Sequence, residues 1–159
     1  MMGINKVIRN RGMNDMPKNL TVEQKNILSS MKVGAAFAAD VAHACITMYV
    51  WDDNPKFLYI YHQELPRTQF LGELPDKTGR ELRGNEEPLV QRALQRGVPL
   101  SGKRELSLGL FVDLRVYPIQ DSKGKCFAVV AFDTNEPEEL FHYDGSGVFK
   151  KYRPTDFEQ

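Results

Sequence analysis

Asp113 and Arg115 are the residues of this sequence best placed to contact a ligand. They lie two positions apart in an apolar run, so a strand there puts both on one face. An arginine can hold a carboxylate or phosphate group through two parallel N–H bonds. If this face lines a cavity, Arg115 is a ligand contact; if it faces water, the two residues form a weak surface ion pair. Phe111 and Tyr117 share the face and complete this candidate set.

Tyrosines supply a second, aromatic candidate site. Tyr49 and Tyr59 lie in consecutive segments rich in β-branched and aromatic residues, with Trp51 and Tyr61 beside them. Rings of this kind can line a ligand pocket. They are also suited to cross-strand pairing in a β-hairpin, which the spacing favours. The candidate ligand-binding residues are therefore Phe111, Asp113, Arg115, Tyr117, Tyr49 and Tyr59.

The histidines and cysteines do not form a recognisable catalytic or metal-binding pattern. His43, His62 and His142 fit no paired-ligand motif. Cys45 and Cys126 lie in apolar runs and are predicted to be reduced core residues. We therefore expect no enzyme and no metal site. The cofactor stays unknown; haem normally requires an axial histidine or cysteine facing the cavity, and only His62 and the two cysteines are candidates.

Composition restricts the class of protein further. The 159 residues are 42% hydrophobic and 26% charged, as in ordinary soluble domains. Twenty-one basic residues balance 21 acidic ones, so there is no general attraction for nucleic acid or for an anionic membrane. No apolar run approaches the roughly 20 residues that cross a bilayer, and the start lacks the apolar core of a signal peptide. We expect a cytoplasmic protein.

Two helices are predicted from capping signals and apolar spacing. The first begins at Thr21, where Gln24 completes a capping box, and continues to about His43. The second is expected to be capped by Asn85, with Glu86 and Glu87 in its first turn near the positive end of the helix dipole.

Five strands are predicted around these helices, in an α+β domain with an antiparallel sheet. Residues 1–20 are expected to be a flexible leader, 21–134 the folded domain, and 135–159 a polar tail. A turn at Gly124 joins the last two strands, because glycine adopts positive φ without strain. The predicted strands are Cys45–Trp51, Lys56–His62, Leu100–Leu106, Leu110–Ile119 and Cys126–Asp133.

Both faces of the central strands are apolar, so both require cover. In the last strand, residues that alternate between the two faces are almost all hydrophobic, unlike a strand with one face in water. The helix at 85–96 is expected to cover one face, and the first helix or a second copy of the chain the other. Small residues at Gly34, Ala35 and Ala38 would permit close helix approach, which predicts a homodimer through the first helix.

The order of helix, hairpin, helical connection and three strands is the PAS topology. Over Cys45–Thr134 the pattern includes Thr78–Arg80, Glu87–Leu94, Val116–Ile119 and Gly124–Ala131. In these features the chain resembles the PAS/GAF-like N-terminal sensor region of some bacterial sensor histidine kinases. Those kinases continue into a phosphoacceptor helix and an ATP-binding domain. The resemblance therefore implies sensing or dimerisation, with a separate signalling protein as partner.

Three hypotheses follow from the sequence. The first is a cytoplasmic PAS-like sensory module that dimerises and binds a small molecule between the sheet and the helices. The second is an interaction module with the same fold and no ligand. The third and least supported is an enzyme that uses Asp113, Arg115 and a histidine.

Overall fold

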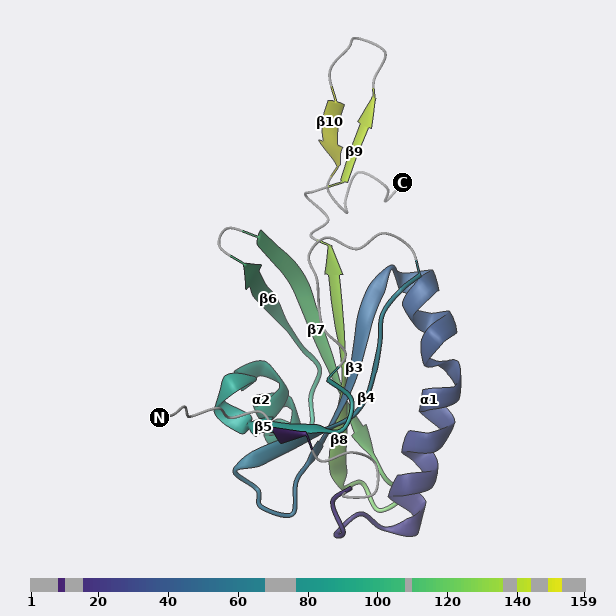
Figure 1. The fold of residues 1–159 in the computed structure, drawn as a ribbon, viewed down its shortest axis with the longest axis vertical. Helices are drawn as coiled ribbons and strands as arrows, with labels where there is room; N and C mark the ends of the chain where they lie inside the picture. The colour runs from purple at the N-terminus through teal and green to yellow at the C-terminus, as the bar shows by residue number, and fades with distance from the viewer. Residues whose placement is uncertain are drawn as a thin grey trace.

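The chain folds into an antiparallel sheet with one helix on each face (Figure 1). The computed structural model describes residues 9–10, 16–67, 77–107, 110–135, 140–143 and 149–152. The leader predicted for 1–20 and the tail predicted for 135–159 therefore lie largely outside the described residues. None of the described helices is long and apolar enough to span a membrane. The predicted α+β class, with a leading helix and an antiparallel sheet, is confirmed.

Seven strands form the main sheet within the described residues, in the order β2-β5-β4-β3-β8-β7-β6. Neighbouring strands are antiparallel throughout. A separate pair, β9 and β10, forms a two-stranded sheet. The elements are β2 (Arg9–Asn10), α1 (Val22–Ala42), β3 (Ala44–Trp51), β4 (Phe57–Glu64), β5 (Arg80–Arg83), α2 (Pro88–Arg96), β6 (Leu100–Ser107), β7 (Leu110–Gln120), β8 (Cys126–Asn135), β9 (Leu140–Tyr143) and β10 (Phe149–Tyr152).

The five predicted strands are present, but the sheet is wider than predicted. Strand β5 pairs with β4, and the two-residue β2 pairs with β5. The sequence of β5 is Arg-Glu-Leu-Arg, which carries no apolar alternation and so gave no strand signal. Its Glu81 is nevertheless fully buried beside Leu82. Cross-strand pairing, rather than local propensity, makes this segment a strand.

Helix α1 begins and ends where the sequence predicts. The Thr21 side chain accepts a hydrogen bond from the Gln24 N–H, and the Gln24 side chain accepts one from the Thr21 N–H. His43 ends the helix with a φ of 52°, and its N–H donates to the Ala39 carbonyl. Leu28 and Ala39 are fully buried toward the sheet. The small alanine side chains on this face let the helix lie close to the strands.

Helix α2 begins later than predicted. Residues Gly84–Glu86 form a 3₁₀ turn, and the helix starts at Pro88, after Glu87. Proline is favoured at the first helical position because its missing N–H would have no helical partner there. The prediction that Asn85 caps this helix is therefore wrong. Glu87, rather than stabilising the helix dipole from the first turn, is the capping residue and turns its side chain into the protein.

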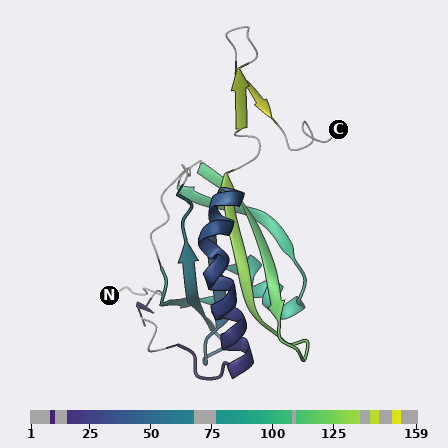
Figure 2. The ribbon, with the colours of Figure 1, turned by 90° about the vertical axis from the view of Figure 1, so that its right-hand side faces the viewer.

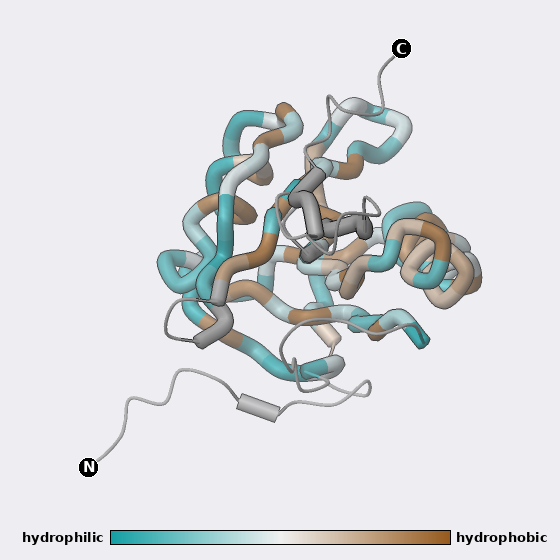
Figure 3. Tube along the Cα trace, turned by 90° about the horizontal axis from the view of Figure 1, so that it is seen from above, coloured by the Kyte–Doolittle hydropathy of each residue, from teal (hydrophilic) through white to brown (hydrophobic). Residues whose placement is uncertain are grey.

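Two hydrophobic cores lie on the two faces of the sheet, as the apolar character of both strand faces predicts. Residues such as Met48, Tyr59 and Val130 form the α1 core, while Ile60, Val90 and Val129 belong to the α2 core. Brown, hydrophobic segments of the chain lie in the interior of the fold in Figure 3. A register shift between Ile119 and Gln120 beside the start of β8 places Phe127 in the α1 core instead of the face shared by Val129.

The two helices cover different halves of the sheet. Helix α1 packs mainly on β3 and β4, whereas α2 packs on β6, β7 and β8. Figure 2 shows α1 in front of the sheet, with the green strands β7 and β8 extending beyond it on one side. The α1-side face of β7 is therefore left exposed.

The burial of α1 predicts a large difference between two truncations on this helix. Leu28→Ala removes a side chain with no exposed surface and should lower the free energy of unfolding by about 3 kcal/mol. Val22→Ala, at a position 75% exposed, should change it by less than about 0.5 kcal/mol. Urea unfolding followed by circular dichroism measures both. Equal losses would contradict the packing of α1 on the sheet.

Candidate functional site

A buried arginine joins α2 to the sheet. Arg104 lies on β6 and donates from Nη1 and Nη2 to the two carboxylate oxygens of Glu87, at 2.6 and 2.8 Å. Its Nε donates to Asp133 Oδ2 at 2.5 Å. The guanidinium thus makes a two-pronged contact with one carboxylate and a third bond to another. Arg104 is the most fully engaged charged side chain between α2 and the sheet among the described residues.

Both carboxylates of this cluster are out of water. Glu87 and Asp133 are buried, and the Arg104 side chain keeps only 21% of its surface exposed. Desolvating three charged groups is unfavourable unless each finds close partners. The three hydrogen bonds satisfy that requirement. They also attach the start of α2 to strands β6 and β8, so the position of the helix depends on this contact.

The cluster perturbs the ionisation of its members. Burial lowers the pKa of Arg104, but the hydrogen bond and charge of Glu87 and the charge of Asp133 outweigh burial and raise it. Burial raises the pKa of Asp133, and the attraction of Arg104 only partly offsets this effect. Tyr49 lies within electrostatic reach of all three groups, and its pKa is raised well above 10.0, mainly by burial. Arg104 and Tyr49 therefore hold their protons at neutral pH.

An open pocket of about 300 Å³ borders this cluster. It lies between the start of α2 and strands β6 and β7. Arg92 and Glu86 are exposed at its rim, while Leu89 and Leu114 provide apolar walls. Lys103 also borders the pocket, but its ammonium group pairs with Asp113 on the opposite face of the β6–β7 hairpin. Gly102 leaves room on β6, since a Cβ there would meet the Leu89 side chain at 3.4 Å. The pocket thus combines apolar walls with the guanidinium groups of Arg92 and Arg104 and the carboxylates of Glu86 and Glu87. A small ligand with an anionic group would compete with these carboxylates for the two arginines.

Sequence reasoning missed this cluster. Arg104 lies in a polar run, Ser101–Glu105, which carries no sign of burial. The sequence pattern predicts Glu87 in the first turn of a helix, where an acidic residue is explained by the helix dipole alone. The one available signal was Asp133, because strand alternation places it on the same face as the buried Val129 and Ala131. A carboxylate continuing an apolar face requires a buried cationic partner.

Four of the six sequence-predicted ligand residues lie together, on the α1-side face of β7. This face extends beyond α1, and Phe111, Arg115 and Tyr117 are exposed there. Asp113 is half-buried and lies 3.6 Å from Lys103 Nζ. A shallow hollow of about 250 Å³ borders Asp113 and Arg115 on β6 and β7. Their predicted role in ligand binding stays a prediction, now placed on an open surface.

The two predicted tyrosines lie on opposite faces of the sheet. Tyr49 belongs to the α2 core, beside the Arg104 cluster. Tyr59 is fully buried in the α1 core. The structure therefore does not bring the six residues into one site, because strand alternation and the one-residue register shift between Met48 and Tyr49 separate the two rings.

The described histidines do not assemble a metal site. His62 Nε2 lies 2.8 Å from Glu64 Oε1 on the same strand, and His43 ends α1. Among the described residues there is no group of three His, Cys, Asp or Glu side chains that could hold a metal ion. Cys45 is buried and Cys126 half-buried, and neither forms a disulfide.

Comparisons with known proteins identify one matching family model and one structural likeness. A family model described as the GAF domain of histidine kinase PdtaS matches residues 16–140, which is most of the chain. One solved structure, titled as a sensory box sensor histidine kinase from Vibrio cholerae, is similar at a TM-score of 0.41 and 13% identity. The alignment covers 70% of this chain and 96% of that one. No curated protein matches the sequence.

Replacing Arg104 should strongly lower the free energy of unfolding. Arg104→Met leaves Glu87 and Asp133 buried without their cation, and we expect it to lower the free energy of unfolding by about 3–5 kcal/mol. Arg104→Lys should recover only part of this loss, because an ammonium cannot make the two-pronged contact. Arg115→Ala, on the exposed face, is the matched control and should be nearly neutral. Urea unfolding measures the free energy of unfolding of all three variants. If Arg104→Met lowered it as little as Arg115→Ala does, the cluster would be solvated rather than buried.

The raised pKa of Asp133 predicts a definite pH dependence. Between the folded pKa and the ordinary value of 3.8, the folded protein binds more protons at this site than the unfolded chain. Stability contributed by this group therefore rises as pH falls through that window. Asp133→Asn cannot titrate, so the free energy of unfolding of wild type relative to this variant should increase from pH 7 toward pH 4. A constant or opposite difference in urea titrations would contradict the prediction.

Proposed function

Because this chain belongs to the GAF-domain family of histidine kinase PdtaS, we propose that it is a sensory module. It binds a small ligand and passes the binding event to a separate signalling protein. Family membership supports the sensory role. The ligand site, the pairing of two copies and the transfer to a partner are our proposals, and each has its own support below. The module works by binding, without turnover.

The pocket beside α2 is the proposed ligand site, and Arg104 is its anchor. The supporting observation is the two-pronged Arg104–Glu87 contact at the pocket wall. A carboxylate or phosphate group of a ligand has the geometry to replace the Glu87 carboxylate on the guanidinium. Arg92 at the rim would attract such a group. The proposed ligand is therefore a small anionic molecule with an apolar part facing Leu89 and Leu114.

Ligand binding at this site would be transmitted through α2. Glu87 caps α2, and its bond to Arg104 holds the helix start against β6 and β8. A ligand that takes Arg104 releases Glu87 and with it the first turn of the helix. Ligand binding thus favours the arrangement of α2 in which Glu87 is released from Arg104. The size of this shift is set by how much more tightly the ligand binds that arrangement than the other. A partner that contacts α2 would sense the difference.

A second location for an anion is the exposed face of β7. Arg115 and Asp113 border a hollow on the other side of the β6–β7 hairpin from Arg104. Because Arg115 is exposed, an ion pair there is screened by water and contributes little binding energy. We therefore favour the pocket beside Arg104 as the anion site. Single substitutions at Arg92 and Arg115 distinguish the two locations.

A pure interaction module without a ligand is the alternative function. It is favoured by the exposed apolar side chains of α1, Val33 and Phe37 among them. In either function we propose that two copies pair through α1. Native mass spectrometry of protein purified from cells distinguishes the sensory module from the interaction module. A bound mass beyond the polypeptide supports sensing, whereas a ligand-free protein that also fails to bind the anionic probes supports the interaction module.

Anionic probes test the site directly. Succinate or inorganic phosphate, at constant ionic strength, should raise the melting temperature of the wild-type protein in differential scanning fluorimetry. Arg92→Glu reverses the charge at the pocket rim without touching the core, and it should abolish the shift while leaving the unliganded melting temperature nearly unchanged.

Arg115→Ala is the control for this experiment. It should keep the probe-induced shift if the pocket beside α2 binds the anion. Loss of the shift in Arg115→Ala and its retention in Arg92→Glu would show that the anion binds at the exposed face of β7 instead. No shift with either probe, at concentrations up to about 10 mM, would overturn the proposal of an anionic ligand.

A further inference from the structure

The outward face of α1 carries a ridge of exposed apolar side chains. Val33, Phe37 and Val41 are 85%, 75% and 63% exposed. They are spaced four residues apart, so they follow one another along the helix surface. Single exposed apolar residues are common, but three in one row on the longest helix form a continuous unpartnered strip.

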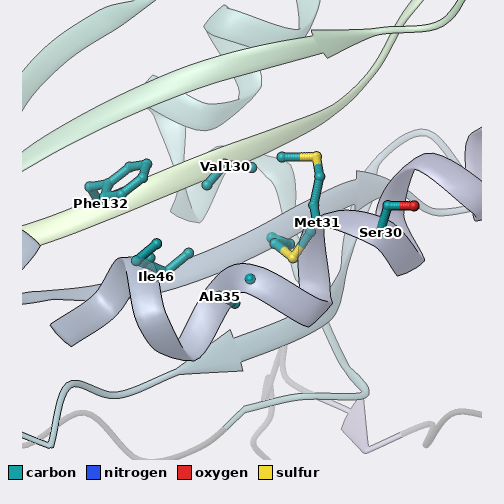
Figure 4. A pocket seen from close by; sticks show the side chains of 9 residues that line it. Ser30, Met31, Ala35, Ile46, Val130 and Phe132 are labelled. Carbon is teal, nitrogen blue, oxygen red and sulfur yellow. The ribbon is translucent and has the colours of Figure 1, made fainter. Parts of the chain in front are cut away.

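A row of small residues runs beside this ridge. Ser30, Gly34 and Ala38 are also spaced four apart, and a Cβ built at Gly34 would meet nothing within 4 Å. These residues form one wall of an apolar groove of about 250 Å³ between α1 and the sheet. The opposite wall consists of strand residues that include Ile46, Val130 and Phe132 (Figure 4). The high ridge and the low row thus lie next to each other on one helix.

We propose that a second copy of this chain docks here, with the ridge of each α1 seated in the groove of the other. Helices commonly pack by inserting a row of residues spaced by four into the groove beside the same row of the partner. Phe37 is the centre of its ridge, with Val33 and Val41 four residues to either side. A two-fold axis that passes between this ridge and the row of small residues places each ridge against the small-residue row of the other copy, as an interface between identical copies requires. This inference deepens the pairing included in the proposed function.

The chemistry of the groove favours a protein occupant over a polar ligand. Of the described residues that line it, only Ser30 carries a polar side-chain group. An anionic or strongly polar ligand would lose its hydration there without gaining hydrogen bonds. An aromatic side chain such as Phe37 of a second copy needs none.

The exposed apolar surface is large enough to matter for a stable dimer. The patch continues from the groove to Tyr117, whose ring contacts Phe132 edge-on at 5.7 Å and which is 42% exposed. At roughly 200 Å² per aromatic side chain, the exposed parts of Phe37 and Tyr117 supply about 230 Å². A standard interface buries about 800 Å² per partner, a little over half of it apolar. These two rings alone thus provide about half of that apolar area, before Val33, Val41 and the groove walls.

The small residues predicted from sequence to mediate this contact divide between two roles. Ala35 also lines the groove, but it is buried against the sheet, so it serves mainly the packing of α1 within one chain. Gly34 and Ala38 border the groove and remain available to a second copy. The bulky residues of the proposed contact, Val33 and Phe37, carried no signal in the sequence, because apolar residues occur on every side of this helix.

Solution mass tests the dimer. Wild-type protein at about 50 μM should sediment with the mass of two chains in analytical ultracentrifugation. Phe37→Glu should raise the dissociation constant at least about 100-fold, because the two-fold axis repeats the loss of an anchoring aromatic residue. Ala36→Glu adds the same charge at an adjacent exposed position off the ridge and should remain dimeric. A monomeric wild type, or a dimeric Phe37→Glu, would overturn the inference.

Two further variants keep the test independent of charge and of folding. Gly34→Leu fills the groove on a helix face with open space, so it should fold normally yet be monomeric. Phe37→Cys protein mixed with Gly34→Cys protein should form a disulfide-linked dimer of the two variants under mild oxidation, whereas Lys32→Cys protein, exposed on another side of α1, should not cross-link to Gly34→Cys protein. Equal cross-linking at both positions would indicate random collision and contradict the interface. If monomeric Phe37→Glu still binds the anionic probes, ligand binding does not depend on pairing, and the two proposals are tested independently.

Discussion

The central strands β3 and β8 are buried on both faces, and the rest of the structure follows from that constraint. Every residue of β3 from Ala44 to Val50 is buried, so neither face can be left to water. A sheet of this kind needs a cover on each side. Helix α1 supplies one and α2 the other, and each is held by its own hydrophobic core. The offset of the two helices across the sheet decides which surfaces stay open.

The Arg104 cluster is the polar exception within this apolar arrangement. A salt bridge with buried carboxylates adds little net stability compared with apolar packing, because each charge must leave water. Its effect is specificity: the two-pronged contact with Glu87 sets where α2 begins relative to β6 and β8. A helix held at its start by one charged contact can be displaced by a competing anion. In the proposed function, this contact is the mechanical link between ligand binding and α2.

The two proposed sites lie on opposite faces of the sheet and need not interfere. The ligand pocket borders α2, while the docking surface is formed by α1 with β3 and β8. Val130 on β8 lines the groove, and its neighbours Val129 and Ala131 face the α2 core. Strand β8 is therefore the shared wall through which a movement at α2 would reach the surface that pairs two copies.

Local sequence patterns are enough to predict the helix ends at Thr21 and His43, the five main strands, the turn at Gly124 and the burial of both sheet faces. These features depend on local capping, alternation and turn chemistry, which neighbouring residues specify. The likeness to histidine-kinase sensor domains also followed from element order. Only the tertiary structure placed Arg104 between two carboxylates and added β5 to the sheet, because both depend on partners distant in the chain. It likewise separated Tyr49 from Tyr59 and left Arg115 exposed, since which half of a face a helix covers is decided by packing.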